Sequence, residues 1–591
     1  ALFFSPFANV WEHSFPESLV AEGLKSKGVE IVTVRCDGLF DDFCIAMSAS
    51  GLTAADSEKK RKQVCSACRK RRDFTDKSFG FDNLLLEEFL EASDYEIASV
   101  LVSETTQDNW TKQTLHVPIG KYSAYEFLLN YKILGSDIPE GLFPKYLSQL
   151  KNSSLSLLAA EKILDQEKPD RVITYNRLYG INHAFLAVAE LRNIPTYSLQ
   201  GGGHVVHRGE TVTMFRNSET QFQVLDSNNW NEYRNSPLDV SDTYLVATHL
   251  QGLMEASSAF AYSSAYEAVD PDKLRERLGI PLSAQVLLIP MSSEDELNAA
   301  ELADLLPDRS SRPNLFSDQF EWINFLFTYA EKHSDLKFIL RLHPRMYPNK
   351  RENVVAPVLE KVLTLIESAP SNVIINYPTD DISLYDLLQI VEVTLGYRST
   401  VGVELAAYGI PVVAPANRDF YTYPEDIQRV GYTKSEYVSE IESALNEGWS
   451  IENMRNAYRW LSFLFTRISV DFSDSVSAKP SSIRPKKPGL KLWLWRKMVF
   501  LIIQFGPLVR ERLSMRNRTT SQLSKDVIFD VLSNIRPNLS DSSVWVKPQS
   551  SAENETSALE ERLKILCTNQ WRDITSEYSV AQKIRTYLSS R

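Results

Sequence analysis

The feature that most constrains the fold is a strand–helix–strand pattern at the start of the chain. Residues 2–4 form a short apolar run, residues 17–27 place Leu19 and Leu24 on one helical face, and residues 30–34 are rich in β-branched side chains. A strand, a helix and a second strand in this order form a βαβ unit, which pairs its strands in parallel. The sequence therefore predicts an α/β fold built on parallel sheets.

The same alternation returns in two later blocks, which predicts two Rossmann-like domains facing across a cleft. The first domain is predicted over residues 1–250 and the second over residues 251–475, and ligands of such sheets bind outside the carboxyl ends of the strands. The strands expected in these blocks cover residues 171–175, 194–199, 286–290, 337–342, 373–377, 391–395 and 409–414.

Two stretches depart from this alternation. Residues 40–165 have a mostly helical pattern without an obvious strand, which predicts a helical insertion in the first domain. Residues 476–591 begin with a linker rich in Ser, Pro and Lys, and they continue as a basic, amphipathic and mostly helical C-terminal extension.

Charge and cysteine content exclude several classes of protein. The net charge is −12, whereas phosphate contacts need a basic surface, so nucleic acid is not an expected partner. Five cysteines are an odd and low number for a secreted disulfide scaffold. The first residues lack a basic segment and a small-residue cleavage site, so we expect no signal peptide and a cytoplasmic location.

A basic, Trp-containing segment adds a membrane hypothesis. Residues 491–500 mix Trp, aliphatic side chains and cations, a composition that suits the interface of an anionic membrane. The apolar stretch 492–509 is interrupted by Arg496, Lys497 and Pro507, so it does not predict a clean transmembrane span. We expect peripheral docking on the inner face of the cytoplasmic membrane; the alternative is an amphipathic helix packed on the core.

The end of one predicted strand carries phosphate-binding chemistry. Arg341 closes the strand, His343 can donate a hydrogen bond to a phosphate oxygen, Pro344 fixes the turn, and Arg345 can add bidentate contacts. The alternative is a capped strand end with a surface histidine.

A second segment has the same character. Ser383 stands near a helix start, and Ser399 and Thr400 fall where a strand gives way to a helix, so that free N–H groups and two hydroxyls would face an anion. Gly402 would allow close approach, and Glu404 could accept ribose hydroxyls. The alternative is an ordinary helix cap with a glutamate in the first turn.

The order Arg-x-His-Pro, Asp-x-Ser, Ser-Thr-x-Gly-x-Glu and Gly-x-Pro-Val resembles the bacterial capsule and surface-polysaccharide glycosyltransferases of the GT-B fold. It is also similar to the CDP-glycerol glycerophosphotransferases and to the bacterial sialyl- and Kdo-transferases. The resemblance covers residues 285–425 and implies that His343, Ser399, Thr400 and Glu404 hold the donor's phosphate and nucleotide. It also implies transfer without a metal or other cofactor.

The resemblance suggests further roles around the cleft. The loop after the first strand of the second domain reaches donor phosphates in GT-B proteins, which implicates Ser292 and Ser293, with Glu294 as a base or sugar ligand. A solvated acidic helix start is the alternative. His13 follows the first strand of the chain, where it could act as the base for an acceptor hydroxyl or merely cap the helix at Pro16.

The acceptor side is expected to include two more segments. Asn176 and Arg177 look like the Asn-Gly-Arg strand end of capsule glycosyltransferases. The usual glycine is absent, and Leu178 follows Arg177. Gln200, Gly201 and Gly202 are expected in a flexible loop at the cleft, or in a tight turn.

Four cysteines near the start form a separate feature. Cys65 and Cys68 make a C-x-x-C within a basic run, and Cys36 and Cys44 precede it. Four thiolates can close a structural zinc site or hold an iron–sulfur cluster, and basic neighbours would offset the charge. The alternative is four unlinked cysteines.

The function expected from these features is transfer of a sugar from a CMP-, UDP- or GDP-linked donor to a growing surface polysaccharide or a glycolipid. The alternatives are a CDP-glycerol-type polyol-phosphate transferase and a non-catalytic glycan-assembly protein with a GT-B fold.

Overall fold

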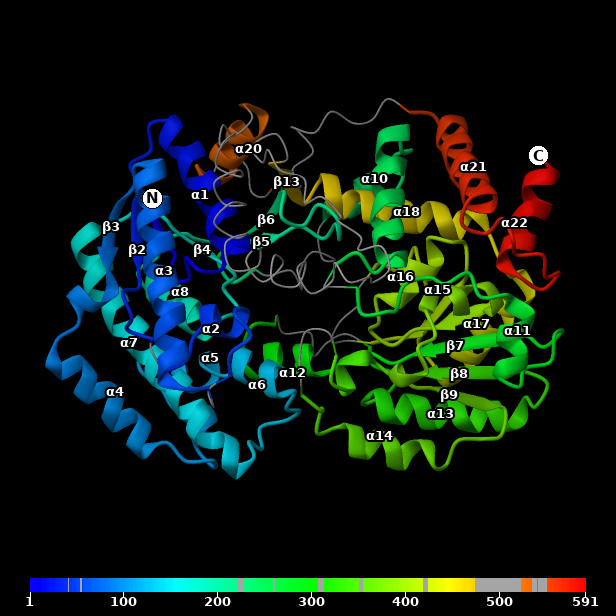
Figure 1. Ribbon diagram of the computed structural model, residues 1–591, viewed down its shortest axis with the longest axis horizontal. Helices are drawn as coiled ribbons and strands as arrows, with labels where there is room; N and C mark the ends of the chain where they lie inside the picture. Colours follow the sequence, from blue (N-terminus) through cyan, green and yellow to red (C-terminus); the bar gives the residue numbers. More distant parts are fainter. Residues whose placement is uncertain are drawn as a thin grey trace, which may run out of the picture.

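The computed structural model describes residues 1–40, 42–53, 56–219, 228–258, 261–306, 313–349, 354–417, 423–472, 522–533, 539 and 550–591. These residues form two α/β lobes that lie side by side, each built on one sheet (Figure 1). The predicted fold class, with two Rossmann-like units, is confirmed by the two sheets.

The first lobe contains a sheet in the order β13-β6-β5-β4-β1-β2-β3. The strands from β3 to β5 run parallel, and β6 and β13 add antiparallel pairs at one edge. The central strands are buried because apolar residues point to both faces, as expected of a parallel sheet covered on both sides. The strands are β1 (Leu2–Phe4), β2 (Val32–Arg35), β3 (Asp82–Leu85), β4 (Val172–Tyr175), β5 (Thr196–Gly201), β6 (Thr211–Arg216) and β13 (Ser469–Asp471).

The prediction that residues 40–165 contain no strand is wrong. β3 lies within this stretch and pairs in parallel with β2 at the sheet edge. Its first two residues, Asp82 and Asn83, are exposed, so the strand lacks the apolar run that marks a buried one. The helices of this lobe are α1 (Trp11–Ser26), α2 (Ile45–Ala49), α3 (Glu58–Phe79), α4 (Ala92–Glu104), α5 (Ile119–Tyr122), α6 (Tyr125–Tyr131), α7 (Phe143–Glu167) and α8 (Gly180–Leu191).

The second lobe contains an all-parallel sheet in the order β12-β11-β10-β7-β8-β9. Its strands are β7 (Val286–Pro290), β8 (Lys337–Arg341), β9 (Val373–Asn376), β10 (Val393–Leu395), β11 (Val412–Pro415) and β12 (Arg429–Gly431). Its helices are α10 (Val240–Met254), α11 (Pro271–Arg277), α12 (Asp295–Leu302), α13 (Gln319–Lys332), α14 (Leu359–Ile366), α15 (Leu384–Leu387), α16 (Val401–Ala406), α17 (Lys434–Glu447) and α18 (Ile451–Thr466), and a short α9 (Asn228–Tyr233) contacts α18.

The chain crosses back to the first lobe before the predicted boundary at residue 475. After α18, β13 pairs with β6, with Ser469 opposite Thr213. The C-terminal helices are also divided between the lobes: α20 (Gln522–Leu532) packs on α1, whereas α21 (Ala552–Thr568) packs on α10 and α22 (Val580–Ser589) on α21 (Figure 1). The predicted extension is therefore not a separate unit.

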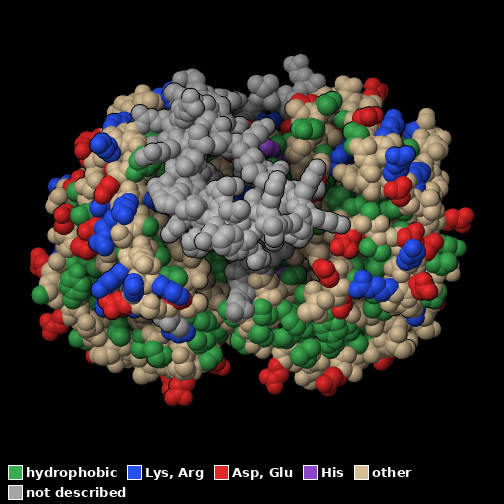
Figure 2. Space-filling model, viewed as in Figure 1, with side chains coloured by type: hydrophobic (Ala, Val, Ile, Leu, Met, Phe, Trp, Pro, Cys, Tyr) green, Lys and Arg blue, Asp and Glu red, His purple; other side chains and the backbone are tan. Residues whose placement is uncertain are grey.

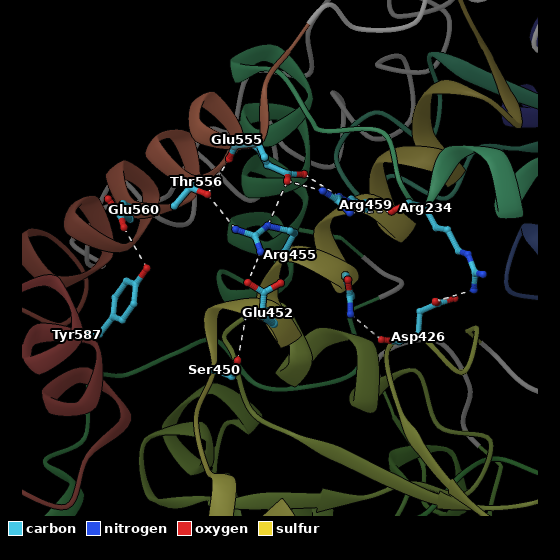
Figure 3. Close-up of polar contacts among 12 residues, drawn as sticks. Arg234, Asp426, Ser450, Glu452, Arg455, Arg459, Glu555, Thr556, Glu560 and Tyr587 are labelled. Carbon is cyan, nitrogen blue, oxygen red and sulfur yellow. Dashed lines mark hydrogen bonds and ion pairs between the residues drawn. The ribbon is translucent and has the colours of Figure 1, made fainter. Parts of the chain in front are cut away.

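Glu555 fixes α21 to the second lobe (Figure 3). Its carboxylate is fully buried, forms ion pairs with Arg459 (Nη2–Oε2 2.6 Å) and Arg455, and accepts the N–H of Leu238 (3.0 Å). Because Leu238 precedes α10 and both arginines lie on α18, one side chain joins three segments.

No helix in the described ranges has the length and apolar character needed to cross a membrane. The basic segment 491–500 lies outside the described residues, so peripheral membrane docking stays a prediction. On the face shown in Figure 2, Lys and Arg side chains are interspersed with Asp and Glu over both lobes.

Candidate functional site

The candidate site lies at the carboxyl ends of β7, β8 and β10. β7 has β8 on one side and β10 on the other. The order in which successive strands are added to the sheet therefore reverses between β7 and β10. Ligands of doubly wound sheets bind at such a switch point. Residues 292–295 follow β7, His343 and Arg345 follow β8, and residues 398–400 follow β10.

A small hollow opens at this edge, between the lobes. The first lobe contributes Lys132 to its lining. The second lobe contributes Ser292, Ser293, Glu294, Asp295 and Arg345. His343, Ser399 and Thr400 do not line this hollow, although they stand at strand ends of the same sheet edge.

Arg345 is mounted rigidly in the hollow. Its guanidinium forms a buried ion pair with Asp295, and its Nε donates to the Ser293 hydroxyl (3.2 Å). Ser293 also hydrogen-bonds Asp295. The neighbouring Ser292 hydroxyl contacts Gln319 (3.2 Å) instead.

Lys132 brings the first lobe to the same edge. Its ammonium group donates to the carbonyl oxygens of Arg345 (2.5 Å) and Val354 (2.8 Å), and its side chain is buried. The sequence analysis missed this lysine because it follows α6 in a helical stretch with no motif. Its contacts span more than 200 residues of chain, which local patterns do not report.

Glu294 is a partly buried acid at the start of α12. Burial raises the pKa of its carboxyl, while the Arg398 guanidinium opposes that shift. Its Oε1 is buried and finds no hydrogen-bond partner among the described residues. Carboxylates with raised pKa values in a cleft are candidates for acid–base catalysis.

His343 presents a neutral ring at the end of β8. Burial lowers its pKa to about 4, and its Nδ1 accepts the backbone N–H of Arg345 (3.2 Å). The proton of the neutral imidazole therefore resides on Nε2, which is left to donate. A neutral donor of this kind suits a phosphate oxygen, as the sequence predicts.

Arg341 and Glu404 form a second polar group behind the strand ends. Arg341 donates to the Ile382 carbonyl (3.0 Å) and to Asn376, and burial lowers its pKa to about 10. Burial raises the pKa of Glu404 to about 7, and its Oε2 accepts the Tyr385 hydroxyl (2.7 Å).

Glu404 is expected to make stability depend on pH. A carboxyl with a pKa of about 7 in the folded state and 4.5 when unfolded stabilises the fold fully below pH 4.5, and this contribution is lost as the pH rises through 7. The difference in unfolding free energy between Glu404→Gln and the wild type should therefore shift in favour of the variant as the pH rises from 4.5 to 7. The shift should be on the order of 3 kcal/mol. The gap is measured as the opening free energy of the α16 amides, from hydrogen exchange corrected for the intrinsic rate at each pH. Glu360→Gln, on the exposed side of α14, is the control, and an equal gap at both pH values would refute the assignment.

Two of the predicted donor-site residues have structural roles, and a third is buried. The Ser383 hydroxyl accepts the Tyr385 N–H (3.3 Å) at the start of α15 and donates to the Ser264 carbonyl (2.9 Å). Gly402 is required by packing, since a Cβ there would lie 1.8 Å from the Tyr423 hydroxyl. Ser399 is buried, and only Thr400, at the cap of α16, is exposed. Packing against Tyr423 therefore accounts for the glycine at position 402, where we expected the close approach of a ligand.

His13 lies in the first turn of α1, which begins at Trp11, so it does not cap a helix at Pro16. Its ring stacks on Tyr175 at the end of β4, with centroids 4.3 Å apart. Burial and the Arg208 charge lower its pKa to about 3. The ring is neutral at physiological pH but is a weak proton acceptor.

The predicted acceptor residues are largely taken up by the fold. Arg177 is 2% exposed and forms an ion pair with Glu190 (2.7 Å), so its guanidinium does not face a cleft. Asn176 adopts a left-handed conformation (φ 62°), and its Oδ1 accepts the Leu178 N–H (3.1 Å). A hydrogen bond between an asparagine side chain and the backbone two residues further on stabilises a turn at this position.

The prediction of a flexible loop at residues 200–204 is wrong for its first part. Gln200 and Gly201 belong to β5, and the Gly202 N–H bonds the Thr211 carbonyl (3.1 Å). A Cβ on Gly202 would lie 2.0 Å from Thr211 Oγ1, so this glycine serves close strand packing.

The two sheet edges nevertheless approach each other. The pKa of Tyr125, on α6 of the first lobe, is raised by burial and by Glu296, Tyr179 and Asp295, while Arg345 opposes that shift. Tyr179 in turn lies 6.1 Å from the His13 ring. The two lobes also meet where α6 packs on α12.

Glu17 is a buried acid that the sequence analysis passed over. It is 3% exposed on α1 and accepts the hydroxyl of Ser5, at the end of β1. Burial raises its pKa to about 7. Its one sequence signal is a carboxylate on an otherwise apolar helix face.

The four cysteines predicted to bind metal are brought together. Cys36, Cys44, Cys65 and Cys68 all line one small hollow beside the loop after β1. Among the described residues, however, no three His, Cys, Asp or Glu side chains already stand at the spacing of a metal's ligand shell.

Comparison with known proteins gives likeness of fold alone. No protein-family model matches the chain, and no curated protein sequence matches it. Among solved structures, a beta-Kdo 2,4-transferase, KpsC of Thermosulfurimonas dismutans, has 13% identity and a TM-score of 0.29, over 49% of this chain and 78% of that one. UDP-GlcNAc 2-epimerase of Neisseria meningitidis, bound to UDP-GlcNAc, has 11% identity and a TM-score of 0.23, over 78% and 96%. The spinosyn rhamnosyltransferase SpnG, complexed with thymidine diphosphate, has 10% identity and a TM-score of 0.24, over 79% and 96%. At these values the likeness carries no argument about donor or acceptor, and the site rests on the geometry of this chain.

Proposed function

We propose that this protein is a glycosyltransferase that binds a nucleotide-sugar donor at the carboxyl edge of the second sheet. The observation that carries the proposal is the hollow at the carboxyl ends of β7 and β8, which Arg345, Lys132 and Ser293 line, beside the switch point between β7 and β10. Cationic and hydroxyl groups at such an edge suit a diphosphate or a phosphodiester.

The donor would extend from this hollow along the sheet edge. The neutral His343 would donate from Nε2 to a phosphate oxygen, and the exposed Thr400 hydroxyl would face the nucleotide. Glu404 stands behind them, bonded to Tyr385, where a carboxylate can accept ribose hydroxyls after a small side-chain movement. Charge that develops on the departing phosphate would then meet positioned donors, which is how such sites lower a barrier.

For the proton transfer, we place Glu294 ahead of His13. A general base works best with a pKa near the working pH. The pKa of Glu294 is raised by burial, whereas that of His13 is lowered to about 3. Glu294→Gln should lower kcat by about 100-fold or more, and His13→Gln by about 10-fold or less, because proton transfer contributes about 10²–10⁴-fold. Initial rates of both purified variants measure this, and the reverse order would assign the base to His13.

The transfer itself is tested by product analysis. Full-length protein is incubated with CMP-, UDP- and GDP-sugars and with a lipid-linked or polysaccharide acceptor, and nucleotide release and acceptor mass are followed together. Sugar added to the acceptor, with matching nucleotide release, supports the proposal. CMP release from CDP-glycerol with a phosphate-containing product would instead identify a polyol-phosphate transferase. If neither product forms, the protein is better explained as a non-catalytic assembly protein.

A further inference from the structure

The turn after β8, which carries His343 and Arg345, is held from the first lobe as well as by its own sheet. Lys132 ends α6 in the first lobe, and its ammonium group donates to the Arg345 carbonyl (2.5 Å) and to the Val354 carbonyl (2.8 Å). The lysine is 1% exposed. A buried ammonium needs such polar partners, and here both of them belong to the other lobe.

We propose that Lys132 is a positioning residue, which fixes this turn so that the His343 ring presents Nε2 to the donor phosphate. The link runs through one residue. Arg345 donates its backbone N–H to His343 Nδ1 (3.2 Å) and accepts the Lys132 ammonium at its carbonyl. Contact between the lobes therefore sets the orientation of the ring. The role in donor binding rests on the proposed function; the positioning of the ring does not.

The backbone at Lys132 favours a different residue. Its φ of 54° lies in the left-handed region, where a side chain is crowded and glycine is not. Glycine is the usual residue at such a helix end. A glycine here would end α6 with less strain, but the Arg345 and Val354 carbonyls would lose this donor. The contact across the lobes therefore accounts for a lysine at this position.

The charge of Lys132 also acts on the His343 ring. Burial is the main cause that lowers the pKa of His343 to about 4, and Asp295 opposes that shift. Arg345, Arg341 and Lys132 each lower the pKa further. A nearby cation disfavours the protonated ring, so the lysine helps to keep the imidazole neutral.

The side chain of Arg345 is held by α12, which is itself fixed to the first lobe. Its guanidinium forms a buried ion pair with Asp295, the first residue of this helix. Further along α12, Ala299 and Ala300 are buried in the apolar core of the first lobe. The turn after β8 is thus gripped at the Arg345 side chain by α12 and at the Arg345 carbonyl by Lys132.

The loop that carries Lys132 is joined to the same helix. Asn298 on α12 donates to the Ile133 carbonyl (3.1 Å), and its Oδ1 accepts the Gly135 N–H (3.0 Å). These two bonds fix the backbone on the C-terminal side of Lys132. The loop and the helix therefore hold the turn together, and both depend on the contact between the lobes.

The first test is hydrogen exchange of the full-length protein without ligand. Lys132→Met removes the ammonium and keeps a side chain of similar length. Exchange of the Arg345 amide should become about 10-fold to 100-fold faster, the usual value of a hydrogen bond from a charged group. The amides of β8 should keep their wild-type exchange, which shows that the sheet is intact. Lys121→Met is the matched control, because this lysine joins the lobes through Asp304 (3.0 Å) without contacting the turn.

The second test reports the ring itself. Nitrogen NMR of histidine-labelled protein should show His343 as the tautomer protonated at Nε2, with its signal assigned by its loss in His343→Ala. Lys132→Met should shift this signal towards a mixture of the two tautomers, and Lys121→Met should leave it unchanged. A lysine that only stabilised the fold would change the melting temperature and not the tautomer.

The third test measures nucleotide affinity by calorimetry with CMP, CDP, UDP and GDP. Lys132→Met should weaken the binding of whichever nucleotide the wild type binds by about 10-fold or more, and Lys121→Met should not. If no nucleotide binds the wild type, the proposed function fails, while the first two tests still decide the role of Lys132.

If Lys132→Met does not fold, Asn298→Ala takes its place, since it frees the same loop and should speed exchange of the Arg345 amide in the same direction. Wild-type exchange of the turn, together with an unchanged His343 tautomer in the folded variant, would overturn the proposal whether or not a nucleotide binds.

Discussion

His343→Ala is expected to lower kcat/KM for sugar transfer by about 100-fold to 1,000-fold, the usual cost of removing one positioned donor to developing charge. The reason lies in the geometry of the ring. Its Nδ1 is occupied by the Arg345 N–H, so Nε2 carries the proton, and a pKa of about 4 keeps the ring neutral at all physiological pH values. Steady-state rates with saturating acceptor measure the effect.

His333→Ala provides the matched control, because this histidine ends α13 and its Nδ1 contacts the Tyr329 carbonyl (2.8 Å) away from the site. Its rate should equal the wild-type rate. The pH profile adds a second check: loss of His343 should not move the acidic limb above pH 5, since the ring does not titrate there. Wild-type turnover in a folded His343→Ala protein would remove His343 from the site.

Glu555→Ala is expected to be the most destabilising single change in the C-terminal part. It leaves Arg455 and Arg459 largely buried without their main carboxylate and frees the Leu238 N–H, and breaking a buried ion pair costs about 3–5 kcal/mol. Because the protein has two lobes, unfolding need not be two-state, so hydrogen exchange of the α21 amides is the measurement. We expect their protection to fall sharply.

Glu553→Ala, on the exposed side of the same helix, should leave exchange of α21 unchanged. Glu555→Gln keeps the shape and the hydrogen bond to Leu238 but removes the charge. Protection of the α21 amides in this variant should therefore lie between that of Glu555→Ala and that of Glu553→Ala. If the α21 amides exchange at the same rate in the Glu555→Ala and Glu553→Ala variants, the carboxylate does not hold the helix. The helix is then held by its apolar face, through Leu559 and Leu563.

The sequence predicted the fold where strands are buried and continuous. β7 and β8 are largely apolar runs with buried centres, and such runs identify parallel strands without tertiary information. β3 was missed because an edge strand with Asp82 and Asn83 has no apolar pattern. β13 was missed because its place depends on pairing with β6, more than 250 residues earlier.

The site followed the same division. Residues at strand ends, such as His343 and Arg345, could be placed from sequence because strand direction fixes the edge they reach. Lys132 could not, since its role arises where two lobes meet. Ser383 and Gly402 fitted a ligand motif. The Ser383 hydroxyl, however, donates to the Ser264 carbonyl, and Gly402 packs against the ring of Tyr423. Local motifs cannot separate packing from binding.

We propose that a nucleotide-sugar donor binds at the carboxyl edge of the second sheet. The most direct measurement is the melting temperature of wild-type protein and of His343→Ala with CMP, CDP, UDP and GDP and their sugar conjugates. A ligand that binds only the folded state stabilises it by about 2.7 kcal/mol at 100 times its Kd. We expect the melting temperature of the wild type to rise with one nucleotide class and that of His343→Ala to stay unchanged. No rise with any nucleotide, or an equal rise in both proteins, would contradict it.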